Sequence, residues 1–188
     1  MRVPDSHRLG EVDGGWRVAL TTLLNERASV GSEGAGPAAR AVSLPFLSAL
    51  LREHGLSEDS SSRRRLAELT ADQMATSYLN RQALDHLISG GEPGPEASVS
   101  KLMYSQNITR ATHFAAEVVG PRLIADTGAW GAFSWNELLL STPALRILGG
   151  TEDIMKNILG ERVLGLPKEP SSDSTTPYRD QRTSRSGS

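Results

Sequence analysis

The sequence predicts an all-α protein, folded as an antiparallel up-and-down helical bundle. Two observations support this fold class: apolar residues recur at helical spacing through most of the chain, and glycine or proline separates the helical segments. About four or five helices joined by short polar turns favour an up-and-down arrangement. A hydrophobic fraction of 38% and a net charge of -2 are ordinary for a globular domain.

The first predicted helix runs from Trp16 to about Val30, and the glycine cluster at 31–36 ends it. A short helix follows over 38–54, where Pro45 predicts a kink.

The next segments are longer. Residues 56–62 are polar and predict a linker, and 63–89 predict a long amphipathic helix ended by a Gly-Gly pair. Pro95 opens the following helix, which runs to the Gly-Pro pair at 120–121, and a shorter helix is expected over 130–140. The apolar residues of the long amphipathic helix are Leu66, Leu69, Met74, Tyr78, Leu84 and Leu87.

The last predicted helix follows a Gly-Gly turn at 149–150. Thr151 is its N-cap, two acidic residues occupy its first turn, and Gly165 and Pro167 close it. Its apolar residues are Ile154, Ile158 and Leu159. Residues 169–188 are rich in Ser, Thr and Arg and predict a disordered tail.

Composition also excludes several classes of function. The chain has no Cys, so it makes no disulfide, which is compatible with a cytoplasmic location. We expect no membrane span, no signal peptide and no nucleic-acid partner. The four His residues show no metal-ligand spacing, so we expect no metal.

Three segments together resemble one enzyme family. Residues 149–167 read GGTEDIMKNILGERVLGLP, which is similar to the end of a flavin-dependent acyl-CoA dehydrogenase. Residues 3–16, VPDSHRLGEVDGGW, with TTLLNER at 21–27, resemble the passage from the middle β-domain of that family into its C-terminal helical domain. Residues 94–102, GPEASVSKL, resemble the start of a long helix in its actinobacterial branch.

The resemblance implies a domain organisation. It assigns 1–15 to the end of the middle β-domain and a linker, and 16–168 to the C-terminal helical domain, ahead of the tail at 169–188. The chain would correspond to about the C-terminal half of such an enzyme. We therefore expect the chain alone to bind flavin poorly and to turn over no acyl-CoA.

The family's reaction requires a carboxylate that takes the α-proton of an acyl-CoA while hydride passes from the β-carbon to N5 of FAD. In one part of the family the base stands at the position of Gly149, and many bacterial members have an acid at the position of Leu148. Neither residue here accepts a proton. Other members carry the base in a Glu-Arg pair that aligns with Glu26 and Arg27, so the resemblance implies Glu26 as the catalytic base. A solvated helix residue is the alternative interpretation of Glu26.

The resemblance also implies binding residues. Arg27 matches a position that contacts the CoA portion of the substrate, with a surface salt bridge as the alternative. Gly149, Gly150, Thr151 and Asp153 match the turn and helix start near the adenosine part of FAD, and an ordinary N-cap is the alternative. A weaker cofactor assignment is Glu117, where many relatives have Gln. Glu152 replaces a common Ser and brings a negative charge near a phosphate.

The family further implies partners: an acyl-CoA substrate from fatty-acid β-oxidation or a related pathway, an electron-transfer flavoprotein as electron acceptor, and a homo-oligomer, either dimer or tetramer. The alternative is a non-catalytic helical remnant or assembly subunit that contributes interface and FAD contacts to a full-length partner. Exposed apolar surface on a separate helical domain would favour assembly in either case.

Overall fold

A computed structural model describes residues 3–31, 40–91, 94–125, 128 and 132–168. Within these ranges the chain forms helices and turns and no strand, which confirms the predicted all-α class. The predicted tail at 169–188 lies outside the described residues. None of the described helices is long and apolar enough to cross a membrane.

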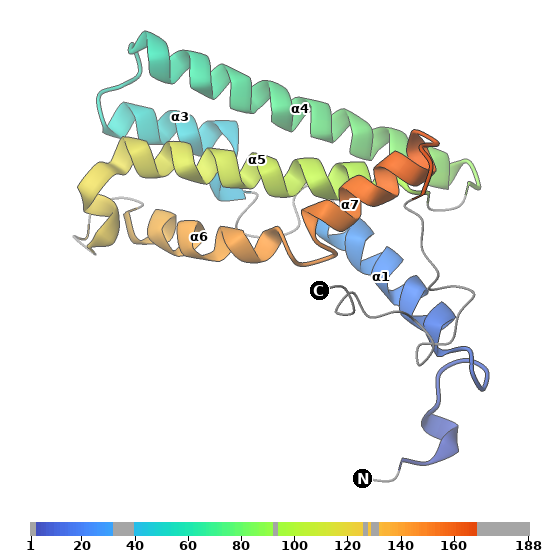
Figure 1. Cartoon of the computed structure of the whole chain (residues 1–188). Coiled ribbons are helices and arrows are strands. Elements are labelled where there is room, and N and C mark those ends of the chain that lie inside the picture. The colour runs from blue at the N-terminus through green and yellow to red at the C-terminus, as the bar shows by residue number, and fades with distance from the viewer. Residues whose placement is uncertain (1–2, 32–39, 92–93, 126–127, 129–131, 169–188) are drawn as a thin grey trace, which may run out of the picture.

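The helices follow the predicted order and form a layered bundle (Figure 1). The main helices are α1 (Gly15–Gly31), α3 (Leu44–Glu53), α4 (Ser60–Ile88), α5 (Glu96–Val119), α6 (Ala132–Leu145) and α7 (Glu152–Ile158). Short helical turns complete the fold: η1 (Asp5–His7), η2 (Gly120–Ile124) and the π-helical η3 (Leu159–Val163), which continues α7.

Helix α5 is the centre of the bundle, in contact with α1, α3, α4, α6 and α7 (Figure 1). Its sequence explains this position, because two of its faces consist mainly of small or apolar residues at helical spacing, with Lys101 and Asn107 as the exceptions. One buried row is Ser98, Lys101, Ser105, Ile108, Thr112, Ala115 and Val119; the other is Ser100, Tyr104, Asn107, Ala111 and Phe114. The core continues into α3 through Leu47 and Leu50, and into α6 through Trp135 and Leu138.

The helix boundaries correct two predictions. Pro45 does not kink a helix over 38–54: α3 begins at Leu44, and Pro45 lies in its first turn, where its missing N–H costs nothing. The linker expected to reach residue 62 ends at Asp59, whose carboxylate accepts a hydrogen bond from the Ser62 N–H at 2.7 Å and so starts α4 at Ser60.

The buried face of α7 also differs from the expected one. Met155 is completely buried, whereas the predicted core residue Ile154 is 49% exposed. The reason is the Gly-Gly turn, because the Met155 side chain lies directly beneath Gly150. The second half of α4 likewise leaves four predicted core residues exposed, namely Met74, Tyr78, Leu84 and Leu87.

Candidate active site

A turn of two glycines joins α6 to α7 and forms the centre of the candidate site. Gly149 and Gly150 have φ angles of 71° and 106°, which side chains other than hydrogen rarely permit. A Cβ added at Gly150 would lie 2.6 Å from Cε of the buried Met155. Position 150 therefore requires glycine for both its backbone and its surroundings.

Glu26, the predicted base, meets this turn. Its Oε1 accepts a hydrogen bond from the Gly149 N–H at 3.1 Å, although the two residues are 123 positions apart in the sequence. Glu26 itself is exposed, so its carboxylate is reachable from outside the bundle. The structure thus brings the predicted base into contact with the residue at the family's other base position. Arg27 belongs to α1, but its side chain lies outside the described part, and its substrate contact stays a prediction.

Lys101 is a site residue that the sequence analysis did not identify. Its side chain is completely buried, and its Nζ donates a hydrogen bond to the Gly150 carbonyl at 2.6 Å. Burial lowers the pKa of Lys101, while the carboxylates of Glu152 and Glu26 oppose that shift. The sequence does indicate this burial, because Lys101 lies three residues after Ser98 and four before Ser105 and is the one charged residue on that row of α5.

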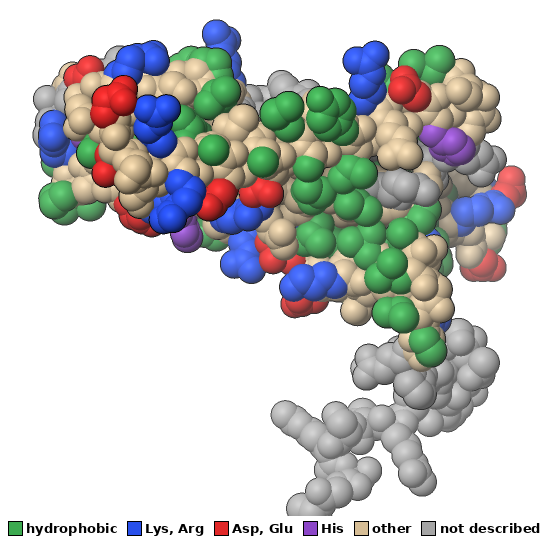
Figure 2. All heavy atoms as spheres, turned by 90° about the horizontal axis from the view of Figure 1, so that it is seen from above, with side chains coloured by type: hydrophobic (Ala, Val, Ile, Leu, Met, Phe, Trp, Pro, Cys, Tyr) green, Lys and Arg blue, Asp and Glu red, His purple; other side chains and the backbone are tan. Residues whose placement is uncertain are grey.

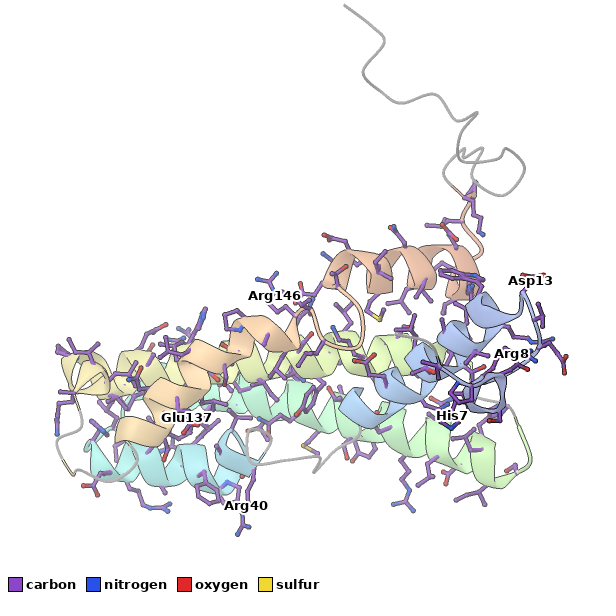
Figure 3. All side chains as sticks on the ribbon, turned by 90° about the horizontal axis from the view of Figure 1, so that it is seen from below. His7, Arg8, Asp13, Arg40, Glu137 and Arg146 are labelled. Carbon is purple, nitrogen blue, oxygen red and sulfur yellow. The ribbon has the colours of Figure 1, made fainter. Side chains whose placement is uncertain are left out.

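Glu152 is paired with Arg146 on the far side of the turn. Nε and Nη2 of Arg146 lie 2.9 and 3.0 Å from the two carboxylate oxygens of Glu152, whose side chain is 11% exposed. The hydrogen bond from Arg146 holds the pKa of Glu152 below its usual value. Figure 3 shows Arg146 beside the loop between α6 and α7. The negative charge that sequence analysis expected near a cofactor is therefore compensated within the chain.

The start of α7 has the predicted cap. Thr151 Oγ1 accepts a hydrogen bond from the Ile154 N–H at 3.3 Å. The N–H groups of Glu152 and Asp153 have no acceptor within the described ranges, as is usual for a first helical turn. The Asp153 carboxylate is exposed and lies 3.7 Å from Nζ of Lys156. This end of α7 offers N–H donors that suit the oxygens of an anionic group.

Glu117 lies far from the turn. It is at the other end of α5, about 24 Å from Lys101 at about 1.5 Å of rise per residue. Both of its carboxylate oxygens accept hydrogen bonds from Arg65 of α4, one of them at 3.1 Å, and these bonds lower the pKa of Glu117. The pair borders a groove between α4 and α5, where the Arg65 guanidinium lies 5.1 Å from the centre of the Phe114 ring. Its assignment to cofactor binding stays a prediction.

Comparison with known families decides the identity of this domain. The model described as "Acyl-CoA dehydrogenase, C-terminal domain" matches residues 13–164. The chain belongs to the acyl-CoA dehydrogenase family. This confirms the resemblance on which the site assignment was based. In the part of the chain that is described, no group of His, Asp and Glu could hold a metal ion.

Similar acyl-CoA dehydrogenases occur in mycobacteria. Acyl-CoA dehydrogenase FadE34 of Mycobacterium tuberculosis is 32% identical over 167 residues, which are 88% of this chain and 22% of the relative. Acyl-CoA dehydrogenase IpdE1 of the same organism is 32% identical over 165 residues, which are 86% of this chain and 40% of the relative. The chain thus spans less than half the length of these relatives.

Solved structures support the same fold. The Tcur3481-Tcur3483 steroid ACAD superposes with a TM-score of 0.76 at 23% identity, over 89% of this chain and 44% of the other. Butyryl-CoA dehydrogenase from Megasphaera elsdenii superposes with a TM-score of 0.64 at 21% identity, over 86% of this chain and 42% of the other. At these identities the likeness establishes the fold of the acyl-CoA dehydrogenase helical domain.

Proposed function

We propose that this chain is the C-terminal helical part of a flavin-dependent acyl-CoA dehydrogenase, and that Glu26 removes the α-proton of the acyl-CoA substrate. The observation that carries this proposal is the hydrogen bond between Glu26 Oε1 and the Gly149 N–H. Some members of the family carry the base at the position of Glu26, and others carry it at the position of Gly149. Because Glu26 contacts Gly149, its carboxylate lies close to both of these positions.

The geometry suits a general base. The Gly149 N–H holds Oε1, and Oε2 has no partner among the described side chains and backbone groups, so it is free to accept a proton. Holding one oxygen limits the orientations of the carboxylate, and orientation is a large part of what a positioned base contributes. The exposure of Glu26 leaves room for an acyl thioester to approach from outside the bundle.

FAD is the cofactor that this proposal requires, and it would accept the hydride that leaves the β-carbon. The residues at the turn fit such a group: Gly149 and Gly150 carry no side chain, and the N–H groups at the start of α7, between Thr151 and Asp153, have no acceptor in the described part of the chain. Arg146 neutralises Glu152, which removes a repulsion between that carboxylate and a phosphate. Arg27 would contact the CoA portion, and an electron-transfer flavoprotein would accept the electrons.

The test is Glu26→Gln in a polypeptide that restores the length of the relatives. The amide fills the same space without accepting a proton, so we expect kcat to fall by about 10⁴-fold while binding of FAD and acyl-CoA is retained. Glu137→Gln is the matched control, since Glu137 is an exposed residue of α6 away from the turn (Figure 3). We expect this control to leave kcat unchanged.

A second change sharpens this test. Gly149→Glu in the Glu26→Gln background would return a carboxylate to the same place, and we expect partial recovery of turnover if the turn accepts a side chain. Near-normal turnover of Glu26→Gln alone would refute the base assignment and point to a carboxylate outside this part of the enzyme. The 188-residue chain by itself is expected to lack the visible absorption of stoichiometric bound flavin.

The proposal includes assembly into a homodimer or tetramer. Large apolar side chains remain exposed on α1 and α4, including Trp16 at 74% and Tyr78 at 66%. Figure 2 shows hydrophobic side chains gathered toward the right of the face seen from above. Apolar surface of this kind favours self-association. We expect light scattering to find dimers, tetramers or larger species, and a monodisperse monomer would contradict this part of the proposal.

A further inference from the structure

We infer that Lys101 is the positioning residue of this site: its buried ammonium group fixes the Gly149-Gly150 turn so that the Gly149 N–H can hold the Glu26 carboxylate. The inference rests on the proposed function for its catalytic meaning. The restraint that Lys101 places on the turn, which we call the clamp, can be measured without an activity assay.

Lys101 places a cation in the interior of the helical domain. Lysine is almost never completely buried unless it has a partner, because removing an ammonium group from water is costly. Lys101 is 0% exposed, and its hydrogen-bond acceptor is a backbone carbonyl and not a carboxylate. A serine or an apolar residue, as elsewhere on this row of α5, would fill the position without that cost. The cation is therefore retained for what it does to the Gly150 carbonyl.

The glycine turn is contacted at two positions. Glu26 binds the N–H of Gly149, and Lys101 binds the carbonyl of Gly150. The two hydrogen bonds thus hold the glycine pair at its first N–H and its last carbonyl. Adjacent glycines have the largest conformational freedom of any residue pair, so a turn built from them needs such restraints to keep one geometry. A charge-assisted bond of 2.6 Å is a strong restraint of this kind.

Charged side chains of both signs surround the glycine turn. The carboxylates of Glu26 and Glu152 both act electrostatically on Lys101, from the two sides of the turn. Arg146 pairs with Glu152, so the cluster contains two cations and two anions. Lys101 therefore completes a cluster whose charges cancel around the glycine turn.

The experiment is NMR spectroscopy of the 188-residue chain, with the Gly149 amide as the reporter. The chemical shift of this amide should change in Glu26→Ala, which removes the hydrogen-bond acceptor. We expect Lys101→Met to change it in the same direction, because the turn is no longer held in place. In Lys101→Met the Gly149 amide should also lose its hydrogen bond to Glu26. A loss of about 1.5 kcal/mol corresponds to about 10-fold faster hydrogen exchange of this amide. The exchange is compared with that of Ile108, a core residue of the same helix.

Lys156→Met is the matched control, because it makes the same chemical change at an exposed lysine of α7. It should leave the Gly149 amide unchanged. A folded Lys101→Met whose Gly149 amide keeps the wild-type chemical shift and exchange rate would overturn the inference. A purely structural role would accelerate the exchange of Ile108 and Gly149 equally, which would also overturn it.

Should Lys101→Met fail to fold, the wild type decides. The Lys101 ammonium protons should then be protected from solvent exchange and show a nuclear Overhauser effect to Gly150, and a rapidly exchanging ammonium would refute the clamp. None of these readouts depends on activity. The two proposals can therefore fail separately. The NMR result can exclude the positioning role of Lys101 even if Glu26→Gln abolishes turnover. It can also support that role even if Glu26→Gln leaves turnover normal.

Discussion

The two ends of α5 hold charged residues in opposite ways. At the Lys101 end, contacts from α1, from α5 and from Arg146 just after α6 converge on the region of the glycine turn, and the lysine is completely buried. At the Glu117 end, Arg65 and Glu117 pair across α4 and α5 with side chains that are 39% and 60% exposed. Both ends contain residues that the sequence assigned to a cofactor site.

The difference lies in what replaces a contact when it is lost. Water can solvate Glu117 if Arg65 is removed, so the pair contributes little free energy. Lys101 is completely buried, so losing its bond to the Gly150 carbonyl leaves a buried ammonium group unpaired. We conclude that the turn is held in one geometry, and that the groove beside Glu117 is held mainly by the packing of α4 on α5.

The largest effect on stability is expected at Gly150. Gly150→Ala forces a side chain into a φ of 106° and places Cβ within 2.6 Å of Met155 Cε, which together should lower the free energy of unfolding by about 3 kcal/mol. Gly55→Ala is the control, with a φ of 68° and open space around its Cβ, and should cost about 1 kcal/mol. Urea unfolding followed by circular dichroism measures both. Equal costs would show that the turn has no steric requirement beyond its backbone.

Lys101 should impose a pH dependence. Because burial lowers its folded-state pKa, the unfolded chain binds more protons between that value and the ordinary lysine pKa of about 10.4. Stability should therefore rise with pH in this alkaline window, relative to Lys101→Met. The cost of burying the charge is present in full below the window. Unfolding curves of the two proteins at a series of pH values check this, and parallel pH profiles would contradict it.

The smallest effect is expected at the other end of the helix. Glu117→Gln removes an exposed ion pair and should change the free energy of unfolding by at most about 1 kcal/mol. Because Arg65 lowers the pKa of Glu117, the small contribution is present above the ordinary Glu value of about 4.3 and is lost as pH falls through the folded pKa. Salt should reduce it further. A larger effect that is insensitive to salt would show that Glu117 contributes to stability as strongly as the residues at the glycine turn.

The sequence by itself determined the class of fold, the order of the helices and their end signals. Thr151 as an N-cap and the boundary between 149 and 152 were predictable because caps and glycine turns depend on neighbouring residues. The Glu-Arg pair at 26 and 27 was found only through resemblance to a family, since its composition is that of an ordinary helix surface.

The tertiary structure alone decided which residues meet at the turn. The contact between Glu26 and Gly149 joins positions 123 residues apart, and helical periodicity carries no information about such pairs. The same holds for Lys101, whose burial follows from the packing of α5 among its neighbours, and for Met155, which replaces Ile154 in the core. Caps and periodicity are local properties of a chain, whereas a site is built where distant helices pack, and that packing depends on every interface at once.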